Sequence, residues 1–447
     1  MTRAPGIELL WRGFAVRLAL PGLSAVLLLA GAVGAGPPQA KAAAGQGSAV
    51  ARSESVEGVL LQRGAGKAWQ PVKAGEALAP EALLVALPKA EIVSKNGAVK
   101  LVMLADVGQR TPLPVLEPAV TLHANDAADL DFTFDRGLIG LKNLKKAGAA
   151  KVRIRLPGET WELTLQEPET TAVLEIYGRH PPGAPQVLKG KVEPPASEVY
   201  LLMLKGQGFL DVGPKGFRIT APPGPAAVHW DTVTREPEVR RLEKLPEGVR
   251  PLDDKESKVY QAICHCASAL EQEKDLGAVL DRLLKSDAKV DRLLGVTAAG
   301  ALDDLPRVLN ALADPKHADL RDHTVLVLRS WIGRGPGQVE KLHDALRAAK
   351  YSEVQARTII RLLFGFSGEE RRDPTTYDLL INYLKHSKLP VRELARWHLF
   401  RLTPLGHEIP CDAAAPAAER QRAYDAWRAR VPEGKLPPAP RAKTAPK

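Results

Sequence analysis

The sequence predicts a multidomain protein, with an N-terminal signal or anchor helix, then an all-β domain, then an all-α helical-repeat domain. Three observations carry this prediction. An uncharged apolar stretch lies close to the N-terminus, at residues 18–36. Apolar and polar residues alternate with a period of two between 151 and 177, which is typical of strands. From about residue 253 the apolar residues recur at helical spacing instead.

Composition sets broad limits on the class of protein. The chain has 447 residues, enough for several domains, and 62 basic against 52 acidic residues give a formal charge of +10. The excess is spread along the chain rather than gathered in a stripe, so we expect no nucleic-acid partner. Cysteines number three, which is too few for a disulfide framework.

Residues 1–36 have the features of a secretory signal. Before the apolar run begins, the segment has three basic residues, Arg3, Arg12 and Arg17, and one acidic residue, Glu8. That run is 19 residues long, just enough to span a bilayer, but Pro21-Gly22 shortens its regular part. Two interpretations of this segment remain, a cleaved signal peptide and a retained membrane anchor. Both predict an exported protein, either periplasmic or anchored facing the periplasm. Residues 37–54, rich in Ala, Gly and Ser, are expected to form a linker.

The all-β domain is predicted at residues 55–233, as a sandwich or a β-solenoid-like layer. Val152, Ile154 and Leu156 alternate with basic residues, and Pro157-Gly158 then supplies a turn. The alternation resumes at 161–165 and again at 171–177. Such short strands at intervals of about ten residues favour a sandwich or solenoid over a βαβ unit.

The first half of this region resembles a FecR-like periplasmic β domain. The resemblance is carried by Gly58, Trp69-Gln70-Pro71-Val72, Gly75-Glu76-Ala77-Leu78 and the hairpin turn Asn96-Gly97. Gly137–Ile176 is similar to the layered continuation of such domains. The chain has Pro80-Glu81 where the family has Gly-Asp, and it lacks the cytoplasmic helices of classical members. The resemblance implies an envelope protein, and these departures from the family pattern count against direct sigma-factor regulation.

Residues 234–251 are rich in proline and charge and predict a second linker. A helical domain follows at 252–432, and 433–447 are expected to form a disordered basic tail. Helices are predicted at the following ranges: 291–302, 306–313, 320–331, 338–349, 354–366, 377–386, 391–402 and 417–430.

Four of these helices begin alike, with an aliphatic residue and an arginine close behind. Their starts at Val290, Leu320, Val354 and Val391 are separated by 30, 34 and 37 residues, a spacing that suits helix-pair repeats. The region resembles a divergent HEAT-like array, which implies a long surface for a protein partner. Arg321, Arg357 and Arg392 could form a basic partner-binding ridge, or each could pair with a neighbouring acid.

Cys264-His265-Cys266 is the strongest candidate for a metal site, with His407 and Cys411 as additional ligands. However, zinc-binding cysteines are usually two to four residues apart, whereas these are separated by one. Buried core cysteines are the simpler interpretation, and a disulfide from Cys411 to one of the pair is an alternative.

No other motif predicts chemistry. Asp126, Asp129, Asp131 and Asp135 do not follow the calcium-loop pattern. The segment 365–368 falls short of a nucleophile elbow, and 333–337 lacks the lysine of a phosphate loop. We therefore expect no catalytic, cofactor-binding or metal-binding residues.

The sequence thus favours an exported, non-catalytic envelope scaffold or sensor. It would bind a ligand through the β domain and an envelope protein through the helical array, with membrane contact if the N-terminal helix is uncleaved. The alternative is a carbohydrate-binding or carbohydrate-active envelope protein with its site in the β domain. For stacking on a polysaccharide the candidates are Trp69, Trp161, Tyr177 and Trp230.

Overall fold

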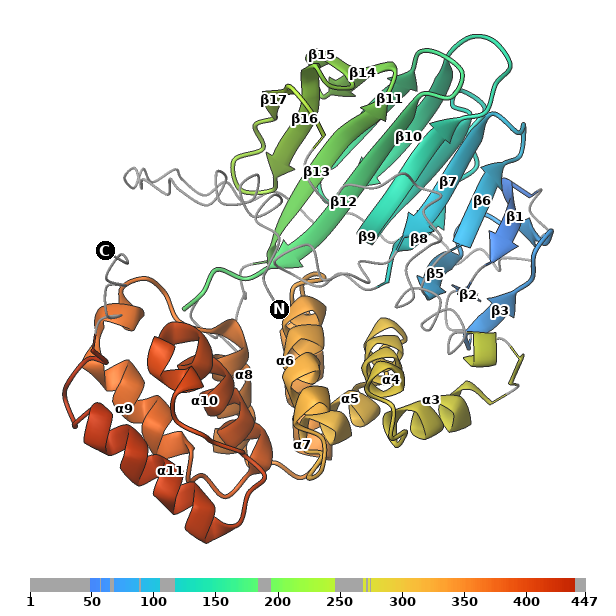
Figure 1. The fold of residues 1–447 in the computed structure, drawn as a ribbon. Coiled ribbons are helices and arrows are strands. Elements are labelled where there is room, and N and C mark those ends of the chain that lie inside the picture. The colour runs from blue at the N-terminus through green and yellow to red at the C-terminus, as the bar shows by residue number, and fades with distance from the viewer. Residues whose placement is uncertain are drawn as a thin grey trace, which may run out of the picture.

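The computed structural model describes residues 49–56, 58–64, 68–87, 90–104, 117–183, 194–245, 268–270, 272–273 and 275–438. It confirms the predicted order, with a large β region at about 50–240 and a helical region at about 268–430 (Figure 1). The apolar stretch at 18–36 and Cys264-His265-Cys266 lie outside the described residues. Within those residues, no helix is both long and apolar enough to cross a membrane.

The strands form two sheets that share one long strand, β9 (Leu130–Asn143). The first sheet, sheet A, has the order β4 (Ala77–Leu78), β1 (Ala51–Val56), β6 (Ala90–Ser94), β7 (Val99–Leu104), β9, β12 (Thr171–Arg179), β13 (Ala196–Lys205), β16 (Gly224–Asp231) and β17 (Glu238–Leu242). The second, sheet B, has the order β3 (Gln70–Val72), β2 (Val59–Arg63), β5 (Leu83–Leu87), β8 (Ala119–Leu122), β9, β10 (Ala150–Leu156), β11 (Glu159–Leu165), β14 (Gln207–Val212) and β15 (Lys215–Thr220).

The strand β9 passes from sheet B to sheet A at Gly137. This glycine has φ +101°, and a Cβ there would overlap the backbone of Pro118. Only glycine tolerates both conditions, so it permits the bend that joins the sheets. Inward side chains of both sheets form one continuous core, including Phe132, Trp161 and Trp230.

Local alternation located the central strands well, since the predicted runs at 151–156, 161–165 and 171–177 fall within β10, β11 and β12. The β region is nevertheless longer than predicted. It begins at Ala51 and continues through β16 and β17, so part of the expected 234–251 linker is a strand. In β17, Arg240 pairs with Glu238. Charged residues are typical of sheet edges, which explains why this strand has the composition of a linker.

The helices form antiparallel hairpins that stack along the lower part of the molecule in Figure 1. They are α3 (Leu276–Leu284), α4 (Lys289–Ala301), α5 (Leu305–Leu312), α6 (Ala318–Ile332), α7 (Gln338–Ala348), α8 (Glu353–Phe364), α9 (Pro374–Tyr383), α10 (Leu389–Leu402) and α11 (Ala417–Arg430), with short 3₁₀ turns at Glu370–Arg372 and Pro404–His407. Their ends follow local signals. Ser352 and Gln355 form a capping box before α8, and Asp373 caps α9 with proline in its first turn.

The helices pack against the outer face of sheet B near its N-terminal strands. Val59, Leu61, Val85 and Leu87 point away from the core between the two sheets and join the core of the helical region. These strands are therefore buried on both faces, which explains their continuous apolar sequences.

Candidate functional site

The β region and the helical region meet at a polar junction built on the C-terminal end of α4. The Leu302 carbonyl accepts a hydrogen bond from Trp69 Nε1 at 3.3 Å, and the Ala301 carbonyl accepts one from Arg136 Nη2 at 3.2 Å. Arg63 lies over the Trp69 ring, 4.3 Å from its centroid. The last carbonyl groups of a helix lack partners within the helix and carry partial negative charge. Hydrogen-bond donors from the β region therefore supply partners for the carbonyl groups at the C-terminal end of α4.

Asp303, directly after this helix end, connects the junction to α6. Its carboxylate accepts from Arg63 at 3.2 Å, from Trp331 Nε1 at 3.1 Å and from Arg334 at 3.4 Å. The buried Arg334 also pairs with Glu117 from the β region. Burial lowers the pKa of Arg334 to about 10, and the neighbouring arginine in β9 acts in the same direction. The pair is an internal contact between the two regions.

Two further helix ends meet the β region beyond β12. His180 Nε2 lies 3.2 Å from the carbonyl oxygen of Ile332, the last residue of α6, and its ring lies 4.6 Å from that of Phe364, the last residue of α8. Burial lowers the pKa of His180, which favours the neutral ring in this contact. The C-terminal ends of α4, α6 and α8 therefore all abut the β region.

The structure does not place Arg321, Arg357 and Arg392 on one exposed ridge, so that prediction was wrong. Arg321 and Arg392 are only 1% and 7% exposed, whereas Arg357 is exposed and pairs with Glu353 at 2.6 Å. The alternative, that each arginine pairs with a neighbouring acid, holds for Arg321 and Arg357, whereas Arg392 donates to backbone carbonyl groups.

The shared arginine at the helix starts closes the turn inside a hairpin. Arg292 Nη1 donates to the Ser286 and Asp287 carbonyls, both at 2.8 Å. One hundred residues later, Arg392 Nη1 donates to the His386 and Ser387 carbonyls at 2.7 and 2.9 Å.

The α5–α6 hairpin is closed in the same way, since Arg321 Nη1 donates to the Asp314 carbonyl at 2.9 Å. The sequence pattern therefore reports a repeated structural contact rather than a binding surface.

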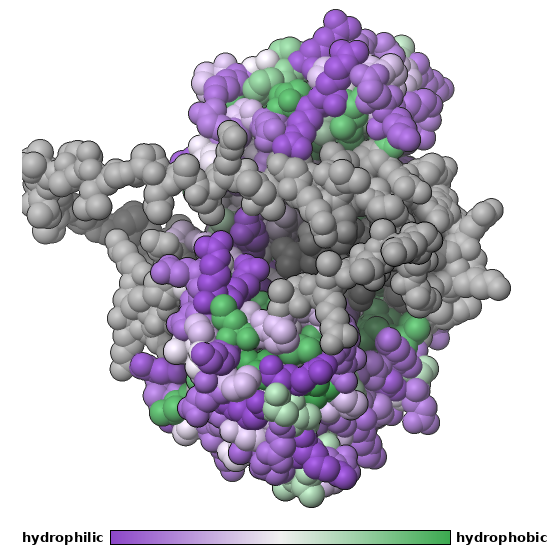
Figure 2. Space-filling view, turned by 60° about the vertical axis from the view of Figure 1, so that its left-hand side comes forward, coloured by the Kyte–Doolittle hydropathy of each residue, from purple (hydrophilic) through white to green (hydrophobic). Residues whose placement is uncertain are grey.

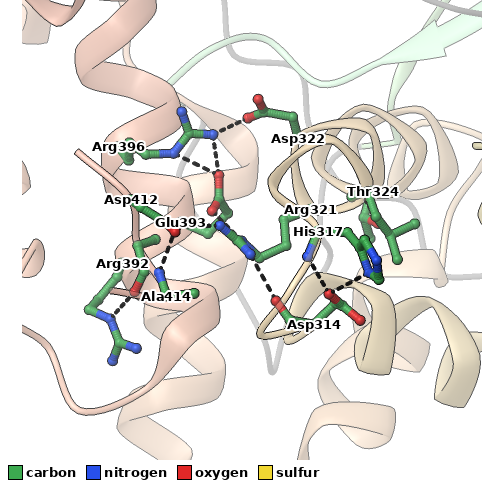
Figure 3. Close-up of polar contacts among 12 residues, drawn as sticks. Asp314, His317, Arg321, Asp322, Thr324, Arg392, Glu393, Arg396, Asp412 and Ala414 are labelled. Atoms are coloured by element: carbon green, nitrogen blue, oxygen red, sulfur yellow. Dashed lines mark hydrogen bonds and ion pairs between the residues drawn. The ribbon is translucent and has the colours of Figure 1, made fainter. Parts of the chain in front are cut away.

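A buried ionic cluster joins α6 to α10 and to the segment that follows it (Figure 3). Glu393, fully buried, accepts from Arg321 Nε at 2.6 Å and from Arg396 Nε at 3.0 Å. Arg321 also bonds Asp412 at 2.6 Å, and Arg396 pairs with Asp322. The two arginines thus face three carboxylates inside one network, which favours a role in holding the helices together.

A second polar cluster lies on the outer face of sheet A, around Glu198. Its Oε2 accepts from the hydroxyls of Tyr177 and Tyr200 at 3.0 and 2.9 Å, and its Oε1 accepts from Arg179 Nε at 2.6 Å. Burial alone would raise the pKa of Glu198, but the contacts with His229 and Arg179 lower it to about 2. A carboxyl group that stays ionised cannot act as the general acid of a glycosidase.

The rings of this cluster also do not form an open stacking surface. Tyr200 stacks against Tyr177 at 6.2 Å and against His229 at 4.5 Å, so the rings cover one another. Trp161 and Trp230 are fully buried, and Trp69 belongs to the junction. None of the four aromatic residues expected to bind a polysaccharide stands free on the described surface.

Two of the four aspartates considered for calcium have basic partners. Asp131 forms a two-bond contact with Arg155 at 2.8 and 2.9 Å, and Asp129 bonds Lys145. Cys411 is a free thiol, and burial raises its pKa to about 11. Within the described residues, no group of three or more His, Cys, Asp or Glu side chains could hold a metal ion.

The aromatic residue that sequence reasoning missed is Phe209. It stands on β14 with 40% of its surface exposed, on the outer face of sheet B. Its neighbours Gly208 and Leu210 are buried, so strand alternation alone could have placed it outward.

On the face seen in Figure 2, hydrophobic residues are scattered among hydrophilic ones in both regions.

Comparison with known proteins gives no further guidance, since no family model, curated protein or solved structure matches this chain.

Proposed function

We propose that this protein is an exported, non-catalytic scaffold or sensor of the bacterial envelope. Its β domain binds a ligand, and its helical array holds a protein partner. The observation that carries the proposal is the junction, where the ends of α4, α6 and α8 abut the β region. A ligand-binding domain joined to a partner-binding array by polar contacts, among them the nearly buried pair of Arg334 and Glu117, can report one binding event to the other.

The repeated turn closure supports a HEAT-like interpretation of the helices. Arg292, Arg321 and Arg392 occupy the same position in three hairpins. Stacked hairpins of this kind bury one face against their neighbours and leave a long surface for partners. The FecR-like resemblance of residues 56–104 and the apolar N-terminal stretch support placement in the envelope.

Export is tested by protease treatment of spheroplasts that carry the full-length protein with a C-terminal tag. We expect the protease to remove the tag from outside, while a cytoplasmic control protein survives. A mature chain of full length in the membrane fraction indicates an anchor, and a shortened soluble chain indicates a cleaved signal. A tag that stays protected contradicts export.

Partner binding is tested with a photo-crosslinking amino acid placed in the array. Val354 and Leu379 are exposed apolar residues on α8 and α9, and Val233 is an exposed apolar residue of the β region. We expect a crosslinked protein adduct at Val354, at Leu379 or at both. The adduct pattern at Val233 should differ from the pattern at these array positions. Absence of adducts at both helical positions, with stable expression, contradicts the array as the partner surface.

The non-catalytic assignment is tested with purified protein and isolated envelope polymers. Hydrolysis that a single substitution in the β domain abolishes would show that the protein is an enzyme.

A further inference from the structure

The outer face of sheet B is covered by helices at one end of the sheet and is polar and exposed at the other end. At β2 and β5 it is covered by helices, whereas at β10, β11, β14 and β15 it carries polar residues of intermediate or high exposure. The registers of these strands align Lys151 with Thr164, Thr164 with Phe209, and Phe209 with Arg218. One row across four strands therefore holds a single exposed aromatic ring between two cations.

The Phe209 ring leans over the adjacent strand. A Cβ built on Gly216 would lie 2.7 Å from Phe209 Cζ and 3.0 Å from Cε1, so the ring occupies the space that a side chain would take. Because Gly216 has no side chain, the edge of the Phe209 ring occupies that space, and 40% of the residue remains exposed. An exposed apolar ring on a flat polar surface is a stacking site for a ligand with its own apolar face.

The cations of the row have no carboxylate partner in the part of the chain that the structure describes. Lys151 forms no ion pair there, and Arg218 donates to the neutral side chain of Gln207 at 2.7 Å. Three strand spacings separate the two cations, which places their backbones about 14 Å apart. In the next row, by contrast, Arg153 is paired with Glu162 at 2.5 Å. The two cations are therefore unpaired within their own row, and the nearest carboxylate to the Phe209 ring, Asp211, belongs to the adjacent row.

We propose that this row binds an anionic polysaccharide of the cell envelope. A pyranose ring stacks through its C–H face on Phe209, and carboxylate, sulfate or phosphate groups on sugars to either side pair with Lys151 and Arg218. The proposal rests on the ligand-binding role proposed above for the β domain, and it names the site and the chemical class of the ligand. Two features of the row favour this ligand class. The positive charges of Lys151 and Arg218 complement anionic groups, and the single exposed ring of Phe209 has about the size of one sugar ring.

A nucleic acid fits the same face less well. Single-stranded nucleic acids are held by several aromatic platforms and a continuous positive groove. This face offers one exposed ring, and the acids Glu162 and Asp211 lie in the row beside it. The row therefore lacks the successive aromatic platforms and the continuous positive groove by which single-stranded nucleic acids are held.

The test is binding of the full-length protein to a linear uronic acid polymer, alginate, by affinity electrophoresis and by titration. Neutral dextran and a single-stranded DNA oligonucleotide are the comparison ligands. We expect alginate binding that weakens with salt, and no measurable binding to dextran. Phe209→Ala should weaken alginate binding about tenfold, a loss that corresponds to about 1.4 kcal/mol, whereas Phe209→Trp should retain it. Lys151→Ala and Arg218→Ala should each weaken binding and reduce its salt dependence.

Two matched variants serve as controls. Val233→Ala removes an exposed apolar residue elsewhere in the β region, and Lys146→Ala removes an exposed lysine from the loop before β10. Both should bind alginate like the unaltered protein. The proposal is overturned if Phe209→Ala binds as tightly as the unaltered protein, if the controls lose binding equally, or if DNA is preferred over alginate. Failure here leaves the crosslinking and export results unaffected, so the proposed function can be judged separately.

Discussion

Gly178 of β12 and Gly333 after α6 meet backbone to backbone, so that a Cβ on either residue would overlap the carbonyl oxygen of the other. The two residues belong to different regions of the fold, and neither has a positive φ. Glycine is needed at both positions for close approach rather than for an unusual backbone conformation. This contact fixes how near the strands come to the helix ends.

Gly333→Ala should destabilise the protein by about 1–3 kcal/mol, because the methyl group forces the two backbones apart. Gly335→Ala is the matched control, since a Cβ at Gly335 meets nothing within 4 Å. The free energy of unfolding from urea titration measures both effects. Equal stability of the two variants would show that the glycine contact does not constrain the junction.

Glu393→Gln should cost about 3 kcal/mol of stability, because it leaves Arg321 and Arg396 buried without their shared counter-charge. The exposed pair of Arg357 and Glu353 offers a contrast, and Arg357→Ala should leave the unfolding midpoint nearly unchanged. Denaturant titrations of both variants check the comparison. A small effect of Glu393→Gln would mean that the network is not required to hold α6 and α10 together.

Stability should fall as the pH drops below about 6.5, partly because of His398. Burial lowers the pKa of this residue to about 3, and Arg329, Arg401 and Arg361 add to the effect. Since the unfolded chain takes up the proton first, the stabilisation is complete above the unfolded pKa and is lost progressively towards pH 3. At pH 5 the loss is about 2 kcal/mol.

The check is a series of urea titrations between pH 7 and pH 5. His398→Gln should show a shallower pH dependence than the unaltered protein, while the exposed residue His407 supplies the control His407→Gln. Parallel slopes for the unaltered protein and His398→Gln would remove His398 as a source of the pH dependence.

Cys411 should react slowly with alkylating reagents in the folded protein. Its pKa is raised from 9.0 to about 11, so the thiolate fraction at pH 8 falls about a hundredfold. A variant with Cys264→Ser and Cys266→Ser isolates the Cys411 thiol. Labelling should accelerate strongly in urea, and rapid labelling of the native state would contradict the burial of this group.

Local patterns in the sequence determined the central strands and most of the helices. β10 and β11 follow from alternation around the Pro157-Gly158 turn, and α11 spans the predicted 417–430 range. These elements depend on side-chain period and turn chemistry, which a short window contains. The change from a period of two to helical spacing near residue 253 also correctly indicated strands before helices.

Only the tertiary structure decided which strands pair and which side chains contact one another. The parallel pairing of β9 with β10, the two-faced burial of β2 and β5, and the contact of Arg321 with Glu393, 72 residues away, have no local signature. The arginine pattern was visible in the sequence, yet its role depended on which carbonyls and carboxylates the fold brought near. Phe209 became a candidate for the same reason, because its neighbours across the strands, Gly216 and Arg218, are set by sheet register. Periodicity fixes which face a side chain takes, whereas long-range pairing fixes what that face meets.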